Sequence, residues 1–284
     1  MGRMRPHPLR GRPRGSKLRP MSTEPVVLTS RDARGIVTAT LNRPALNNAY
    51  NGDMLNALIS GMQSMAGDPS VRGLVIRGAG RNFQAGADVN WLTQASTASP
   101  EAAHAASMLT TRAMQVLNEF PKPTFAVIHG ACFGGGTGIA CCVDVALAST
   151  QASFGISEVK VGVSPTPIST HMVHAMGVRH TRRYAITGER FGPDEAMRIG
   201  LVHEVHAPEA LEARLEEIIH TMLHSAPTAI AMTKRSMLGA NGLLLDERTM
   251  DQLAYESWMQ RASEEGREGL AAFREKRKPR WAPQ

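Results

Sequence analysis

A glycine-dense segment between an apolar strand and an apolar helix constrains this chain more than any other feature. Residues 129–138 read His-Gly-Ala-Cys-Phe-Gly-Gly-Gly-Thr-Gly and follow the apolar run 125–128. A dinucleotide-binding fingerprint counted from Gly134 would need glycine where the chain has Ile139, and a Walker phosphate-binding loop would need a lysine. Two interpretations stay open. The segment is either a tight strand-to-helix turn, or it presents backbone N–H groups to an oxyanion at a helix N-terminus.

A second run of small residues occurs earlier in the chain. Residues 82–88 read Asn-Phe-Gln-Ala-Gly-Ala-Asp and again follow an apolar stretch, 71–76. An oxyanion hole needs more than one N–H donor, and two separate loops can supply them. The presence of two such loops therefore favours the oxyanion interpretation over a tight turn alone.

The order of predicted elements indicates a layered α/β core followed by helices. We expect a helix at 51–65, capped by Asn51, and another at 91–121, because apolar residues recur there at helical spacing. Glycine interrupts residues 130–138, where we expect a loop. Strands that alternate with helices are typical of an α/β layered core. We expect a core over 21–205 and a helical region over 206–284. Strands are predicted at 26–28, 36–41, 71–76, 125–128, 145–148 and 153–154, and later helices at 169–176, 178–186, 193–199, 208–225, 227–238, 245–263 and 264–275.

Charge and cysteine content say little about partners. The formal net charge is +7, but residues 1–20 hold seven basic residues and four prolines and no acidic residue. We expect this segment to be a disordered extension ahead of a start at Met21, which leaves a neutral body and no nucleic-acid partner. A nucleic-acid or membrane-surface arm is the alternative. The three cysteines favour a reducing, cytoplasmic setting, and no run of 18 apolar residues predicts a membrane span.

Taken in order, the motifs resemble the signature of the enoyl-CoA hydratase/isomerase, or crotonase, superfamily. The resemblance rests on Phe-x-Ala-Gly-Ala-Asp, then His-Gly-x-x-x-Gly-Gly-Gly, then Asp144, and it extends from residue 26 to the C-terminus. It implies an α/β fold with a crotonase-like ββα spiral core and a helical C-terminal trimerisation region. It also implies an acyl-CoA thioester as substrate, coenzyme A only as part of that substrate, no metal, and a homotrimer or hexamer.

The resemblance also assigns roles to residues. It places the backbone N–H groups of Ala87 and Gly135 on the thioester oxygen and makes Glu158 the general acid/base. Hydratases of this family carry a second glutamate at the position of Gly138, so half of the carboxylate pair is missing here. The resemblance implies contacts with substrate or coenzyme A for Arg43, Ala49, Ala85, Asp88, Gly134, Gly138, Phe273 and Lys276. For Asp88 a loop-capping role is the alternative, and for Arg43 and Lys276 it is solvated surface charge.

These assignments predict an enoyl-CoA hydratase that adds water across a 2,3 double bond. Single-glutamate relatives include hydratases of branched glutaconyl-CoA esters from leucine and acyclic terpene breakdown, and the segment 157–169 resembles that group. We expect a substrate carboxylate, a polar side chain or a water to replace the missing glutamate. The alternatives are a double-bond isomerase that uses Glu158 alone and a non-catalytic thioester-binding protein.

Two other enzyme classes are disfavoured by single positions. Related thioester hydrolases have aspartate where this chain has Thr166, and a short-chain dehydrogenase would need a Tyr-x-x-x-Lys motif, which the sequence lacks.

Overall fold

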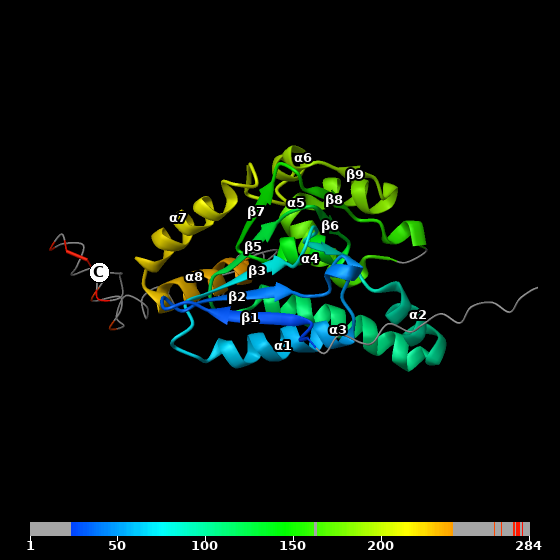
Figure 1. Ribbon diagram of the computed structural model, residues 1–284, viewed down its shortest axis with the longest axis horizontal. Helices are drawn as coiled ribbons and strands as arrows, with labels where there is room; N and C mark the ends of the chain where they lie inside the picture. The colour runs from blue at the N-terminus through cyan, green and yellow to red at the C-terminus, as the bar shows by residue number, and fades with distance from the viewer. Residues whose placement is uncertain are drawn as a thin grey trace, which may run out of the picture.

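The computed structural model describes residues 24–161 and 164–240, together with Glu264, Glu268, Glu275, Arg277, Lys278 and Arg280. A six-stranded sheet crosses the middle of the molecule (Figure 1) in the order β1-β2-β3-β5-β7-β10. All neighbouring pairs are parallel except β1 with β2. The strands are β1 (Val27–Arg31), β2 (Ile36–Leu41), β3 (Gly73–Gly78), β5 (Thr124–Ile128), β7 (Val145–Ser149) and β10 (Glu204–His206).

Helices cover both faces of this sheet, which explains why its inner strands are apolar throughout. In β3, Leu74 and Ile76 belong to the larger core cluster with α1, α3 and α4, whereas Val75 belongs to a second cluster on α7. Side chains alternate between faces along a strand, so a strand buried on both sides reads as a continuous apolar run. The helices are α1 (Gly52–Ala66), α2 (Val89–Ala98), α3 (Pro100–Asn118), α4 (Gly135–Cys142), α5 (Thr166–Thr187), α6 (Pro193–Arg198), α7 (Leu211–Leu223) and α8 (Pro227–Ala240).

A smaller sheet holds the segments that the sequence singled out. Its order is β4-β6-β8-β9, with β4 (Gln84–Ala85), β6 (Ala131–Phe133), β8 (Ser153–Gly155) and β9 (Arg190–Phe191). The prediction of a plain loop over 130–138 is wrong, because Ala131–Phe133 form a strand between β4 and β8 and α4 already begins at Gly135. Two short 3-10 helices, Pro44–Leu46 and Glu158–Val161, flank this part of the chain.

Local sequence signals explain where the helices begin. The Asn51 side chain accepts a hydrogen bond from the Met54 N–H at 3.1 Å and caps α1, as predicted. The single helix predicted over 91–121 is wrong, because the backbone is extended at Ser99. The Ser99 hydroxyl caps α3 and Pro100 takes its first position, a favoured place for proline. The two helices predicted over 169–186 correspond to α5, which is kinked at Gly177.

Several predictions fall outside the described residues. These are the basic segment 1–20 and the helices expected at 245–263 and 264–275, apart from the single positions named above. Within the described part of the chain, no helix has the length and apolar character needed to cross a bilayer.

Candidate active site

Three neighbouring parallel strands of the small sheet end side by side and deliver the three predicted catalytic residues. Ala85 of β4 is in register with Phe133 of β6, which is in register with Gly155 of β8. Ala87 and Gly135 each follow two residues after their strand position, and Glu158 follows three after Gly155. Ligands bind outside the carboxyl ends of parallel strands in α/β sheets. The structure therefore brings together the residues that the sequence placed in one site.

The backbone N–H groups of Ala87 and Gly135 are both available to a ligand. Gly135 is the first residue of α4, so its N–H has no acceptor within the helix. Ala87 forms a parallel bridge with Tyr50, which uses the carbonyl of Gly86 and the N–H of Asp88 and leaves the Ala87 N–H out. Both residues line one cavity of about 590 Å³. The helix dipole adds positive potential at Gly135.

Glycine at 86 and 134 lets the two loops approach each other. Both residues have positive φ, 91° and 53°, a conformation that side chains rarely adopt. A Cβ on Gly134 would lie 3.4 Å from the Gly86 Cα and 2.8 Å from Oε1 of Glu158. The absence of side chains therefore allows the carboxylate to contact the loop that presents Gly135.

Glu158 is a half-buried carboxyl in a largely apolar wall of this cavity. Its Oε2 is buried and has no hydrogen-bond partner among the described residues. Burial raises the pKa of Glu158, and hydrogen bonds from the backbone of Glu158 and Ser157 offset that rise in part. A carboxyl whose pKa moves toward neutrality exchanges protons with substrate more readily near pH 7. Within the described lining, Glu158 is the one acidic side chain, and no lysine, arginine or histidine joins it.

The position of the missing glutamate is filled with apolar atoms. Gly138 is buried in α4, and a Cβ built there would lie 2.6 Å from Cγ2 of Ile168 and 3.3 Å from the sulfur of Met114. The atoms that a Cβ at this place would meet are apolar, those of Ile168 and Met114. A polar side chain, a water or a substrate carboxylate that replaces the missing glutamate would therefore have to act from elsewhere in the cavity, which Ile168 also lines.

Several hydroxyl-bearing residues of the cavity, among them Tyr50 and Thr110, were not foreseen from the sequence. The Tyr50 ring lies against Gly135, where it leaves no room for a Cβ. Burial raises the pKa of Tyr50 to about 12, and the charge of Glu158 acts in the same direction. In the sequence, Tyr50 is marked only by its position directly before Asn51, the residue that caps α1.

Arg43 and Asp88 pair with each other beside the oxyanion loop. Their side chains are 2.8 Å apart and only 16% and 14% exposed, and Arg43 also donates to the Ala49 carbonyl at 2.6 Å. Asp88 accepts from the Asn90 N–H and caps α2, which matches the capping alternative. Neither Arg43, Ala49 nor Asp88 lines the cavity in its described part, so their contact with coenzyme A stays a prediction.

Other predicted residues lie apart from the cavity or outside the described chain. Ala85 and Gly134 line the cavity. Asp144 has a structural role, because its Oδ2 accepts hydrogen bonds from the Thr124 N–H at 2.8 Å and from Lys234 of α8 at 2.8 Å. Phe273 and Lys276 fall outside the described residues.

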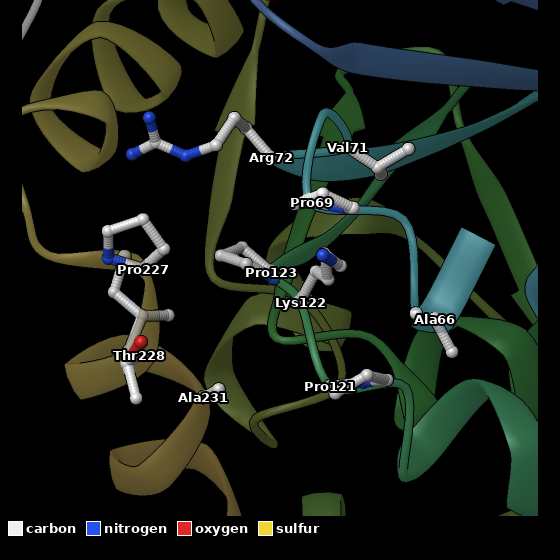
Figure 2. Close-up of a pocket in the computed structure, with 12 residues that line it drawn as sticks. Ala66, Pro69, Val71, Arg72, Pro121, Lys122, Pro123, Pro227, Thr228 and Ala231 are labelled. Atoms are coloured by element: carbon white, nitrogen blue, oxygen red, sulfur yellow. The ribbon is translucent and has the colours of Figure 1, made fainter. Parts of the chain in front are cut away.

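A second cavity of about 420 Å³ lies away from these groups, between α1, the segments before β3 and β5, and the start of α8 (Figure 2). Proline rings form much of its wall, and its two cations already donate to backbone carbonyls. Lys122 donates to Asp68 at 2.8 Å, and Arg72 donates to Ser225 at 3.3 Å. Among the described residues that line it there is no carboxylate, cysteine or histidine.

Known proteins match this chain along most of its length. Residues 31–284 match the family model described as enoyl-CoA hydratase/isomerase. The crotonyl-CoA hydratase of Syntrophomonas wolfei is 30% identical, over 91% of this chain and 98% of its own. Among solved structures, AtuE of Pseudomonas aeruginosa is 36% identical with a TM-score of 0.88, over 91% of this chain and 100% of that one. An enoyl-CoA hydratase from Shewanella pealeana is 34% identical with a TM-score of 0.86, over 90% and 96%. The crotonase-like fold class predicted from the sequence is thereby confirmed.

Proposed function

The chain belongs to the enoyl-CoA hydratase/isomerase family, and on that premise we propose that it adds water across the 2,3 double bond of an acyl-CoA thioester. The observation that carries the proposal is the position of Glu158. Its carboxylate, whose Oε2 has no hydrogen-bond partner among the described residues, lies against the loop that presents the Gly135 N–H, in the cavity that Ala87 also lines.

The two N–H groups would stabilise the charge that develops on the thioester oxygen. When water attacks C3, electrons move from the double bond toward the carbonyl, and the oxygen becomes an enolate. Preorganised donors aimed at such an oxyanion are worth about 2.7–4 kcal/mol each in comparable sites. Gly135 and Ala87 are supported in this role because Gly135 is the first residue of α4 and the bridge between Tyr50 and Ala87 leaves the Ala87 N–H out.

Glu158 would act first as base and then as acid. As the water oxygen bonds to C3, one water proton passes to the carboxylate, and that proton then moves to C2 as the enolate collapses. The sum is one water across the double bond with the carboxylate regenerated. A raised pKa of Glu158 suits both steps. A carboxyl that loses and regains its proton closer to neutral pH can accept a proton from water and then donate it to C2.

For the acyl group, the described lining supports an uncharged chain, plain or branched. Apolar side chains such as Leu92, Met108 and Ile168 line the cavity, and its described part offers no cation to a substrate carboxylate. A glutaconyl-type ester remains the more specific proposal, supported only by Gly138 and the resemblance of segment 157–169. Rates with crotonyl-CoA, 3-methylcrotonyl-CoA and 3-methylglutaconyl-CoA would decide. A carboxylated ester that is hydrated no faster than the uncharged ones would eliminate the glutaconyl proposal.

The decisive experiment compares hydration of crotonyl-CoA and 3-methylglutaconyl-CoA by the wild type, Glu158→Gln and Glu209→Gln. Glu209 is an exposed acid in a loop and gives a matched control. We expect Glu158→Gln to lower kcat about 10²–10⁴-fold, the usual contribution of acid–base catalysis, with the control unchanged. Hydration that survives Glu158→Gln would refute the mechanism.

Double-bond isomerisation is the second candidate, because one carboxyl is enough to move a proton between two carbons. The single acidic residue in the described lining supports it. The same variants, supplied with a 3-enoyl-CoA ester, distinguish the two. A wild type that converts it to the 2-enoyl ester and forms no hydroxyacyl product would favour the isomerase.

We also propose a homotrimer or hexamer, supported by the family assignment alone. Light scattering coupled to gel filtration measures the mass directly, and a monomer at micromolar concentration would contradict the proposal.

A further inference from the structure

The site must orient a water with one carboxylate, since the second position is closed. A water that attacks carbon has to point a lone pair at it, which is achieved when both of its hydrogens are held by acceptors. Glu158 supplies one acceptor. The place beside Gly138 supplies none, because Ile168 and Met114 fill it.

Tyr50 is a hydroxyl-bearing side chain of this cavity that can supply the other acceptor. Its ring lies against Gly135 and its backbone bridges Ala87, so it is fixed to both oxyanion residues. Tyr50 is 9% exposed, and its ring meets Trp91 edge-on, with centroids 6.0 Å apart. It lines the cavity together with Glu158. The residue is therefore rigidly held at the reacting end of the cavity.

The phenol oxygen of Tyr50 has lone pairs to offer inside this cavity. Thr110, which lines the same cavity, is 3% exposed, and its hydroxyl donates its single hydrogen to the Ala106 carbonyl at 3.1 Å. Thr110 therefore does not donate to the phenol. The phenol stays protonated at neutral pH, since burial raises the pKa of Tyr50 to about 12. Its oxygen keeps lone pairs to accept a hydrogen bond.

We propose that the Tyr50 phenol oxygen is the second acceptor for the attacking water, in place of the missing glutamate. This inference rests on the proposed hydration. One water hydrogen transfers to Glu158 as the oxygen bonds to C3, and the other stays on that oxygen, hydrogen-bonded to Tyr50, and becomes the hydroxyl hydrogen of the product. Tyr50 gains and loses no proton. Isomerisation and proton exchange at C2 need no water, so they do not depend on this contact.

The test is Tyr50→Phe, which removes the oxygen and keeps the ring on Gly135. Tyr184→Phe is a matched control, because Tyr184 is also buried, at 2% exposure, and donates to Glu195 rather than to the cavity. Two rates are measured for each variant. One is kcat for hydration of crotonyl-CoA. The other is exchange of the C2 hydrogens of butyryl-CoA with D₂O, which requires Glu158 and the oxyanion hole but no attacking water.

We expect Tyr50→Phe to lower hydration about 3- to 10-fold, the range of one neutral hydrogen bond, with exchange at the wild-type rate. Retained exchange also shows that the variant is folded. Hydration at the wild-type rate in Tyr50→Phe, or equal losses of hydration and exchange, would overturn the inference. A wild type that exchanges but does not hydrate would instead refute the proposed function, and the role of Tyr50 with it.

Discussion

Packing at Gly138 can be measured by adding a single methyl group. Gly138→Ala would place Cβ 2.6 Å from Cγ2 of Ile168, a distance that real side chains do not tolerate. Alanine gains about 0.8–1 kcal/mol over glycine within a helix, whereas forcing a methyl into a packed core costs about 1–3 kcal/mol. Gly61→Ala in α1 is the matched control, because its Cβ would find only the Met65 Cε, at 3.9 Å. The control should show the propensity gain alone.

The two variants should therefore differ in unfolding free energy by about 1–3 kcal/mol, with Gly138→Ala the less stable. For a chain of this size that corresponds to about 2–4 °C in Tm per kcal/mol. Thermal unfolding followed by circular dichroism, at one protein concentration so that any assembly is held constant, gives the difference. Adding Ile168→Ala to Gly138→Ala should remove the clash, so the two changes should be non-additive. Equal Tm values for Gly138→Ala and Gly61→Ala would show that the place beside 138 is open and would refute the reasoning.

Three further variants test charged side chains in or near the site. Glu158→Gln should be more stable than the wild type at pH 7–8, by about 1–3 kcal/mol, since it removes a buried, unpartnered carboxylate oxygen. Because burial raises the pKa of Glu158 in the folded state, its protonated form is favoured by folding. That contribution is complete below the unfolded value near 4.5 and is lost as pH rises through the folded pKa, so the advantage of the variant should shrink toward pH 4. Urea unfolding across pH measures it, and an advantage that grows at low pH would contradict the assignment. Arg43→Met and Asp88→Asn should be non-additive in unfolding free energy by about 0.5–3 kcal/mol, because their side chains pair at 2.8 Å, whereas additive losses would mean that each residue acts independently.

The sequence predicted the structural features that are set by interactions between residues close together in the chain. The Asn51 cap, the apolar strands 36–41 and 125–128, and the glycine run before α4 each depend on neighbouring residues, so pattern and propensity predict them. The two loops that carry Ala87 and Gly135 were paired because each follows a strand. Ser99 followed by Pro100 is also a local signal for a helix start, and it explains the break that a single long helix missed.

The remaining features depend on contacts between distant residues. β4 has two residues and β6 has three, too few to show a periodic pattern. They form strands because they pair with each other. The contact of Ile168 with Gly138 depends on how α5 packs on α4. Tyr50 has no motif of its own, because its proposed role depends on Gly135 and Glu158, which reach the cavity from α4 and from the segment after β8.

The register of β4, β6 and β8 has a consequence for how this site can vary. Adjacent strands lie about 4.8 Å apart whatever connects them, so the separation of the oxyanion donors from each other and from the carboxyl is set by backbone pairing. The connections between these strands contain whole helices, α2 and α3 in one and α4 in the other. Those connections can lengthen or shorten, and so reshape the acyl cavity, without moving the reacting groups. A shift of one residue within β6 would instead displace Gly135 relative to both neighbours and turn its strand side chains to the opposite face.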